Sequence, residues 1–514
     1  MSPDDDRRPT TDTADDDLEN QQASAPDGTG GVPPATAVPT EAGEYDFVVV
    51  ANRLPVDATV TGAGVETNRS PGGLVTALAP IMREADGAWV GWAGTPDLDL
   101  DAFDDDDIHL VPVPLTADEI EAYYEGFSNG TLWPLLHDAV VDPEFHRTWW
   151  NSYVTVNRRF ATAAAKAAAP GATVWVHDYQ LMLVPSLLRA LRPDLRIGFF
   201  LHIPFPPPEI FAQLPWRKQV VEGMLGADLV GTQRTSDAAN ILRSVRRHTD
   251  LTTRGQVVTV GSRWTRPERH VRIAAFPISI DSGSISALAE TPEVIERAAQ
   301  IRRELGDPAV MLLGVDRLDY TKGIRHRLKA FGELLQDGAV SVPDVTLVQV
   351  ASPSREQVEE YRVLRDDVEV TVGRINGDHG ALGRAAIHYL HHSYPLEEMV
   401  AMYRAADVML ITALRDGMNL VAKEYVAART DLDGVLVLSE FAGAADELGQ
   451  ALIVNPHDID GMKRAILEAI AMSPREKRRR MRALRRRVLD SDVQSWARSF
   501  LGTLGAMPSR DSHV

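Results

Sequence analysis

Cysteine is absent from the 514-residue sequence, which excludes disulfide bonds, thiol catalysis and metal sites with cysteine ligands. The sequence also lacks an uninterrupted apolar run near the ~18–20 residues that a membrane-spanning helix needs. Its N-terminal stretch, MSPDDDRRPTTDTADDDLEN, has no apolar segment of the kind found in signal peptides. These absences together predict a cytoplasmic protein that does not enter a membrane.

Positive charge is in the minority, with 53 lysines and arginines against 73 aspartates and glutamates. The resulting net charge of −20 argues against a nucleic-acid partner. Residues 1–43 hold ten acidic and two basic residues among Pro, Thr, Gly and Ala, a composition that cannot form a hydrophobic core. We therefore expect a disordered acidic tail over 1–43. The length of the remaining chain predicts two domains.

From residue 44 onward, short β-rich runs alternate with helical patterns such as PSLLRALR and LEEMVAMYRAA. Several runs are continuously apolar, as in parallel strands that are covered on both faces. This alternation predicts an α/β protein with doubly wound sheets, and the strands are too many for one small sheet. We expect a hinge between two sheets near residues 281–296. The predicted strands are 46–52, 173–178, 196–202, 227–233, 271–280, 309–316, 345–352, 406–413, 434–440 and 451–455.

The stretch VDRLDYTKG follows one of these strands and leads into a helical pattern. Because ligands of doubly wound sheets bind at the carboxyl ends of the strands, this loop is a candidate anion site. Arg317 offers a planar fork of donors, and Lys322 is a compact charge beside the free N–H groups of the helix start. Gly323 would let a ligand approach the backbone. The alternative is a surface cluster in which the two cations pair with Asp316 and Asp319.

A second loop, LRDGMNLVAKEY, follows the predicted strand 406–413 in the same way. Its backbone amides could face a ligand, and Glu424, early in the following helix, suits the two hydroxyls of a ribose. The spacing between Asp416 and Glu424 is weak as a signal by itself. Two such loops in one half of the chain favour an anion- and sugar-binding site over a surface cluster.

Both loops resemble the donor-site motifs of the trehalose-6-phosphate synthase family (glycosyltransferase family 20), retaining glycosyltransferases of the GT-B fold. The resemblance extends from about residue 46 to about 505 and includes ANRLPV, SPGGLVTAL, YYEGFSNGTLWPLLH, VWVHDYQLMLVP and GFFLHIPFPPPEIF. It implies two Rossmann-like domains that face each other across a cleft. They are an N-terminal acceptor domain (44–280) and a C-terminal nucleotide-sugar domain (281–475), followed by a helix (476–505) that crosses back to the first.

The activity that the resemblance implies is glucosyl transfer with retention from UDP-glucose to glucose 6-phosphate, giving UDP and α,α-trehalose 6-phosphate. Arg317 and Lys322 would hold the diphosphate with the backbone of Gly73, Glu424 would bind the ribose, and His202 would contact the donor glucose. The implied catalytic residues are Arg317, Lys322, His202 and Asp416, and the implied donor-binding residues are Gly72, Gly73, Arg317, Lys322, Asp416, Gly417, Met418, Asn419, Leu420, Val421 and Glu424.

The implied acceptor site holds the phosphate of glucose 6-phosphate with Arg53, Tyr124 and Arg355, whose donors suit a phosphate dianion. Trp133 would form a wall against the sugar, and Asp178 would accept hydrogen bonds from its hydroxyls.

Some of these residues have a structural alternative. Trp133 lies in an apolar stretch and could be core, and His202 could be a satisfied histidine at a strand end. Only one of Tyr123 and Tyr124 can face the cleft, and we expect Tyr124.

Three charged or histidine-rich clusters do not change this interpretation. His388, His391 and His392 lack carboxylates at a useful spacing, so we expect a solvated helix end rather than a metal site. The run DDDD (104–107) is expected to be a solvated loop. The run KRRRMRALRRR is expected to be an amphipathic helix rather than a nucleic-acid site. We predict no metal and no cofactor, because Arg317 and Lys322 can balance the diphosphate.

No motif acid is left as a nucleophile, because Asp416 and Glu424 are assigned to donor binding. We therefore expect front-face substitution, in which the leaving diphosphate takes the acceptor proton. Two alternatives stay open: a GT-B synthase with another acceptor such as glycerol 3-phosphate, and a non-catalytic sugar-phosphate-binding regulator. Besides its substrates, we expect a second copy of the chain as partner, in a dimer or tetramer.

Overall fold

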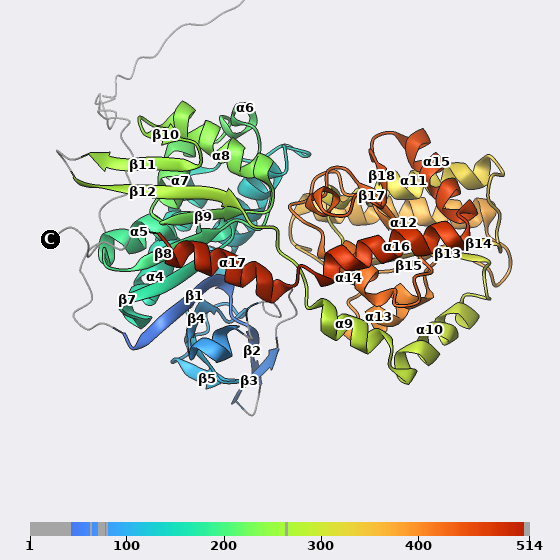
Figure 1. Cartoon of the computed structure of the whole chain (residues 1–514), viewed down its shortest axis with the longest axis horizontal. Helices are drawn as coiled ribbons and strands as arrows, with labels where there is room; N and C mark the ends of the chain where they lie inside the picture. Colours follow the sequence, from blue (N-terminus) through green and yellow to red (C-terminus); the bar gives the residue numbers. More distant parts are fainter. Residues whose placement is uncertain (1–42, 62–63, 70–77, 79–80, 263–265, 508–514) are drawn as a thin grey trace, which may run out of the picture. The chain divides into compact units, whose positions relative to one another are not determined.

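The computed structural model describes residues 43–61, 64–69, 78, 81–262 and 266–507. Within these residues the strands form two large sheets and one hairpin (Figure 1). In this part of the chain, no helix is both long and apolar enough to cross a lipid bilayer. Apart from Gly43, the predicted acidic tail lies outside the described residues.

The first sheet consists of ten strands: β1 (Tyr45–Arg53), β4 (Ala88–Trp92), β5 (Phe103–Asp105), β6 (Ile108–Pro112), β7 (Ala168–His177), β8 (Arg196–Phe200), β9 (Leu229–Thr232), β10 (Thr252–Arg254), β11 (Val257–Ser262) and β12 (Arg266–Ala275). Their order is β10-β11-β12-β9-β8-β7-β1-β4-β6-β5. The strands from β12 to β6 are parallel, whereas both edges of the sheet pair antiparallel. The chain order reverses beside β1, which is therefore a switch point of the sheet.

The second sheet consists of six strands: β13 (Val310–Arg317), β14 (Val345–Ser352), β15 (Ile387–Leu390), β16 (Val408–Ile411), β17 (Val435–Ser439) and β18 (Leu452–Val454). All are parallel, in the order β15-β14-β13-β16-β17-β18. Chain order reverses between β13 and β16, which places a second switch point there. The hairpin pairs β2 (Val56–Thr61) with β3 (Gly64–Arg69).

Each large sheet with its helices is called a lobe below. The helices of the first lobe are α2 (Ala117–Glu119), η1 (Ile120–Leu132), α3 (Trp133–Leu136), α4 (Arg147–Ala167), η2 (Tyr179–Leu181), α5 (Val184–Leu191), α6 (Pro208–Phe211), α7 (Arg217–Met224), α8 (Thr235–His248) and α17 (Val493–Gly505). Those of the second lobe are α9 (Ser282–Ala289), α10 (Pro292–Glu304), η3 (Tyr320–Lys322), α11 (Ile324–Gln336), α12 (Glu359–His379), α13 (Leu396–Ala405), α14 (Leu420–Ala428), η4 (Gly443–Asp446), α15 (Ile459–Ala471) and α16 (Pro474–Leu489).

The C-terminal region, which we expected to be one helix over 476–505, forms two. The basic run lies in α16, which is amphipathic as predicted and buries Met481, Leu484 and Val488 in the second lobe. It is α17 that packs against the first sheet, where it lies across β8 (Figure 1). Phe500 of α17 stacks on Trp175 with ring centroids 4.7 Å apart.

All ten predicted strands are present, since continuous apolar runs suit strands that helices cover on both faces. The segment where we expected a hinge, near residues 281–296, lies between β12 of the first sheet and β13 of the second, and its residues 282–289 form α9. Two expectations about other segments are wrong. His388 lies in β15 rather than at a helix end, and Nδ1 of His391 bonds the carbonyl oxygen of Ala351 at 2.9 Å. Part of the expected DDDD loop, Asp104–Asp105, belongs to β5.

Candidate active site

The switch points of the two sheets gather most of the residues that the sequence singled out. In the second lobe, β13 leads into the loop with Arg317 and Lys322, and β16 leads into the loop with Asp416. In the first lobe, β1 ends at Arg53 and β7 is followed by Asp178. Residues far apart in sequence meet because neighbouring parallel strands end at the same edge of a sheet.

A buried ion pair joins the two loops of the second lobe. Lys322 lies at the end of η3, directly before α11, and is 8% exposed. Its Nζ donates to Oδ2 of Asp416 at 2.7 Å, and the same oxygen accepts from Nδ2 of Asn419 at 3.2 Å. Burial opposes ionisation of Asp416, but Lys322 and Asn419 hold its pKa below the usual value. The pair therefore fixes a cation at the start of a helix.

The two acids of VDRLDYTKG do not pair with the cations of the same stretch. Oδ2 of Asp316 accepts from Arg327 at 2.7 Å, and Oδ2 of Asp319 accepts from Arg355 at 3.0 Å. Arg317 is exposed and has no ion-pair partner among the described residues. The surface-cluster alternative is therefore wrong, and a cation at the end of β13 is left to bind an anion.

Gly323 meets the protein backbone rather than a ligand. Its φ of 65° is in the left-handed region, and a Cβ there would lie 2.1 Å from the carbonyl oxygen of Thr412. We predicted that a ligand would approach the backbone of Gly323 closely. The group that does so is the backbone at the end of β16.

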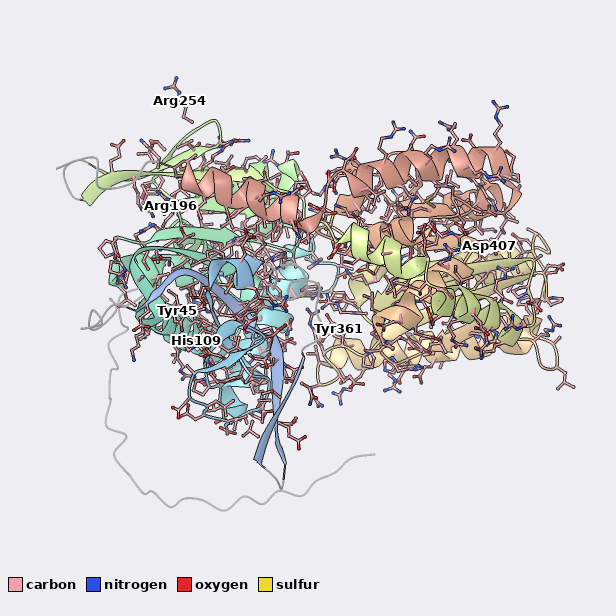
Figure 2. The ribbon with its side chains drawn as sticks, turned by 60° about the horizontal axis from the view of Figure 1, so that its bottom comes forward. Tyr45, His109, Arg196, Arg254, Tyr361 and Asp407 are labelled. Carbon is pink, nitrogen blue, oxygen red and sulfur yellow. The ribbon has the colours of Figure 1, made fainter. Side chains whose placement is uncertain are left out.

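Arg355 is held by a network of buried groups. Its NH1 bonds Oδ2 of Asp319 and the hydroxyl of Tyr361 (labelled in Figure 2), while its NH2 donates to the hydroxyl of Tyr179 at 3.1 Å. The guanidinium carbon lies 3.7 Å from the ring centroid of Trp133. Trp133 is only 3% exposed, so it belongs to the core and still serves as the platform under an arginine.

The adjacent tyrosines of η1 point in different directions. Tyr123 is fully buried and donates its hydroxyl to Oδ1 of Asn52 at 2.7 Å. Tyr124 is half-buried and interacts electrostatically with Arg355. Tyr124 is thus the one that remains accessible at the site, as expected.

Arg53 is linked to Tyr124 by contacts with the ring of Trp92. Its guanidinium pairs with Asp57 and lies 4.7 Å from the ring centroid of Trp92, and that ring is 6.3 Å from the ring of Tyr124. Nε of Arg53 is buried without a hydrogen-bond partner. In the described part of the chain, no contact joins Arg53 to Arg355, so the structure brings the three predicted phosphate ligands together only in part.

Asp178 and His202 are linked through the backbone. Asp178 has a φ of 75°, and its Oδ1 accepts from the N–H of His202 at 3.2 Å. Burial raises the pKa of Asp178 to about 6, although backbone N–H groups, Arg317 and Arg355 act in the opposite direction. Burial lowers the pKa of His202 to about 3, so its imidazole is neutral.

The loop after β16 approaches His202 closely. A Cβ on Gly417 would lie 2.4 Å from the carbonyl oxygen of His202, so only glycine fits here. Asn419 has a φ of 86°, and its Oδ1 caps α14 by accepting from the N–H of Ala422 at 3.0 Å. Met418 is 4% exposed. Leu420 and Val421 form the half-buried first turn of α14.

Glu424 is half-buried in α14, where its Oε2 accepts from the hydroxyl of Tyr403 at 2.9 Å. Burial raises its pKa in spite of this hydrogen bond. The other carboxylate oxygen has no hydrogen bond within the described residues. An acceptor group is therefore present at the predicted ribose position.

Several residues of the site were not predicted. Tyr179 follows Asp178 at a switch point, and its position after a predicted strand could have identified it as a candidate site residue. Tyr361 lies in the middle of the chain with no motif around it. His137 is 1% exposed, its Nδ1 bonds the carbonyl oxygen of Trp133 at 2.8 Å, and burial lowers its pKa to about 3. Nothing in its apolar sequence context distinguishes it from a core residue.

Gly72 and Gly73 lie outside the described residues. Groups of three or more His, Asp or Glu side chains that could hold a metal ion do not occur in the part of the chain that the structure describes.

The profile of glycosyltransferase family 20 matches residues 45–506, which include both switch-point clusters. The chain belongs to this family. A trehalose-6-phosphate synthase of Mycobacterium sp. (strain JLS) is 58% identical over 466 residues, which cover 90% of this chain and 96% of the relative. A trehalose-6-phosphate synthase of Mycobacterium avium (strain 104) is 58% identical over 477 residues, which cover 91% of this chain and 97% of the relative.

Two solved structures agree with the fold. A protein from E. coli bound with UDP-2-fluoro glucose has a TM-score of 0.82 at 34% identity, covering 90% of this chain and 100% of the neighbour. A UDP-forming α,α-trehalose-phosphate synthase from Burkholderia xenovorans, in complex with glucose-6-phosphate, has a TM-score of 0.81 at 33% identity, covering 90% and 99%. The two-sheet architecture of this family 20 chain is the predicted GT-B fold.

Proposed function

We propose that this chain transfers the glucosyl group of UDP-glucose, with retention, to glucose 6-phosphate, giving α,α-trehalose 6-phosphate and UDP. The observation that carries the proposal is the Lys322–Asp416 pair at the switch point of the second sheet, which fixes a cation at a helix start beside the unpaired Arg317. The relatives at 58% identity are trehalose-6-phosphate synthases, and the solved neighbours bind a UDP-glucose analogue and glucose-6-phosphate.

On the donor side, Arg317 and Lys322 would bind the diphosphate together with the N–H groups at the start of α11. The free oxygen of Glu424 would accept hydrogen bonds from the ribose hydroxyls. Asp416 would act mainly by holding Lys322. UDP is the donor nucleotide that we propose, because the E. coli neighbour was solved with a UDP-sugar.

On the acceptor side, Arg355 on its Trp133 platform and the accessible Tyr124 would bind the phosphate, with Arg53 approaching over Trp92. A phosphate dianion would compete well for Arg355, because guanidinium groups bind phosphate in a bidentate manner. Asp178 would accept hydrogen bonds from sugar hydroxyls.

The mechanism that fits these residues is front-face substitution. Asp319 and Asp416 are each paired with a cation, and the free oxygen of Glu424 is assigned to the ribose, so these three acids are left without a role as nucleophile. We therefore propose that the bond to the leaving diphosphate breaks while the acceptor hydroxyl approaches the same face. A diphosphate oxygen then takes the acceptor proton. Arg317 and Lys322 would stabilise the charge that develops on the leaving group.

We further propose that the chain works without a metal or cofactor, since Arg317 and Lys322 would balance the charge of the diphosphate. A homo-oligomer, either a dimer or a tetramer, and a cytoplasmic location are proposals as well. Sedimentation of the purified protein tests the oligomeric state. The absence of cysteine fits the cytoplasm, which is a reducing compartment.

The experiment that tests the proposed function is an acceptor comparison with UDP release as the readout. Glucose 6-phosphate should support turnover, whereas glucose should be a poorer acceptor by about 10²-fold or more, because two or three charged hydrogen bonds of about 1.5–3 kcal/mol each would be lost. Efficient transfer to glycerol 3-phosphate would establish the alternative synthase. Binding of UDP-glucose without turnover on any acceptor would establish the regulator.

A further inference from the structure

A second histidine lies directly behind His202. His177 is the last residue of β7 and is fully buried. Its Nδ1 is 3.0 Å from Nε2 of His202, and the two ring planes are inclined by 28°, with centroids 5.3 Å apart. The rings of Trp175 and Phe200 also contact His177, at centroid distances of 4.6 and 6.5 Å. The two imidazoles thus share one hydrogen bond of ordinary length in an apolar aromatic setting.

Only one proton can lie between the facing nitrogens, so one ring must donate and the other must accept. Both rings are neutral, since burial keeps the pKa of each well below the usual value. If His202 donated through Nε2, the proton of His177 would be on its own Nε2. That atom is buried and has no hydrogen-bond partner. This arrangement would leave an unpaired N–H in the core.

The surroundings of His177 also disfavour an N–H at this position. Nε1 of Trp175 and Nε1 of Trp496 are buried without partners, and both are donors only. The ring of Trp175 contacts His177, and the ring of Trp496 contacts both Trp175 and His202. Beside these two N–H dipoles, an unprotonated Nε2 on His177 has a more favourable electrostatic energy than a protonated Nε2. The protonated form would be a third unpaired donor in the same region. The favoured arrangement therefore has the proton on Nδ1 of His177.

The backbone of His202 is fixed on both sides. Its N–H donates to Asp178, and its carbonyl oxygen lies against Gly417 of the loop after β16. The backbone therefore leaves only the rotation of the imidazole undetermined. The hydrogen bond from His177 fixes this rotation. With Nε2 occupied as an acceptor, Nδ1 of His202 carries the proton, and it has no partner among the described side chains and backbone groups.

We propose that His177 is a positioning residue, which donates from Nδ1 to His202 and so presents His202 to the donor sugar as a neutral N–H donor of fixed orientation. This rests on the proposed function in one respect only: that the group His202 faces is the glucosyl part of the nucleotide sugar. The tautomer and the orientation of His202 follow from the protein alone.

Three substitutions of His177 separate positioning from packing. In His177→Asn, the side-chain amide is near the former Nδ1 and can still donate to His202. In His177→Gln, the amide is displaced toward the former Nε2 position, and His177→Phe removes the donor while keeping an aromatic ring. We expect kcat with UDP-glucose to fall about tenfold in the Gln and Phe variants, the size of one oriented hydrogen bond, and by less than about threefold in the Asn variant. KM for glucose 6-phosphate should be unchanged in all three.

The melting temperature and an NMR spectrum complete the test. His177→Phe removes an unpaired polar atom from the core but also takes the donor away from Nε2 of His202, so its melting temperature should change little. The ¹³Cδ2 shift of His202 in histidine-labelled protein distinguishes the two neutral tautomers, and we expect the Nδ1–H form in the wild type. This readout does not require glucosyl transfer, so the inference survives even if the proposed substrates are wrong. An Nε2–H tautomer of His202, full activity of His177→Phe, or equal losses in the Asn and Gln variants would each overturn it.

Discussion

Replacing Arg355 by methionine should weaken both the fold and acceptor binding. The side chain of Asp319 is fully buried and that of Arg355 is 5% exposed, so the variant would leave a carboxylate without its arginine. Removing one partner of such a pair typically costs about 3–5 kcal/mol. Lys322 and Arg317 also act on Asp319, so we expect about 2–4 kcal/mol here.

The loss should depend on pH in a defined direction. Burial disfavours the Asp319 carboxylate, but Arg355, Lys322 and Arg317 together hold its pKa below the usual value. In the wild type this contribution to stability is present above the unfolded-state pKa of about 4, and it disappears as the pH falls through the lower folded-state value. Without Arg355, the increase that burial causes in the pKa of Asp319 is opposed by fewer positive charges. The stability difference between variant and wild type should therefore shrink as the pH is lowered from 7.5 to 5.

Urea unfolding at both pH values, together with binding data, measures this prediction. KM for glucose 6-phosphate should rise by about 10- to 150-fold, the equivalent of one charged hydrogen bond, while Kd for UDP stays nearly the same. Asp319→Asn in the Arg355→Met background should restore most of the stability. Arg254, which points away from the ribbon in Figure 2, provides the matched exposed control in Arg254→Met. Wild-type stability of Arg355→Met, or equal damage to UDP binding, would refute the reasoning.

Three further predictions concern the donor site and the N-terminal tail. Lys322→Ala and Arg317→Ala should each lower kcat by about 10²-fold or more, as loss of a transition-state donor does. Of the two, only Lys322→Ala should also lower the melting temperature, because Asp416 then loses its partner; unchanged turnover in either variant would disprove the leaving-group role. Activity should survive extensive dialysis against EDTA, and recovery by Mg²⁺ of a lost activity would show that a metal takes part. Deletion of residues 1–43 should leave kcat and the melting temperature nearly unchanged, since this polar segment precedes the family match; a large drop in either would show that it packs.

The sequence predicted the strands and the loops of the site well, for a physical reason. Strands covered on both faces must be apolar throughout, so β1, β13 and β16 are visible as uninterrupted runs. Chemistry in a doubly wound sheet lies at strand ends, so Arg317 and the loop of Asp416 could be located from the amino-acid pattern alone. The roles assigned to single residues depended on the family resemblance, and they remain proposals.

The pairing of side chains could not be predicted, because it depends on elements that are distant in sequence. The sequence offered Asp319 a partner within its own loop only as an alternative, and it gave no sign that Asp319 pairs with Arg355, 36 residues away. Lys322 meets Asp416 across 94 residues because β13 and β16 are neighbours. The hydrogen bond between His177 and His202 exists because β7 and β8 lie side by side. Short strands such as β5 and β10 were missed, since three residues carry too little pattern to be recognised.

The central claim is retaining glucosyl transfer to glucose 6-phosphate, and analysis of the product by ¹H NMR tests it most directly. Purified protein incubated with UDP-glucose and glucose 6-phosphate should give UDP and one disaccharide phosphate in equal amounts. Both anomeric protons of that product should have the small coupling of α-linked glucose. A β-anomeric signal would contradict retention. Release of UDP with free glucose, or no disaccharide at all, would contradict the proposed transfer itself.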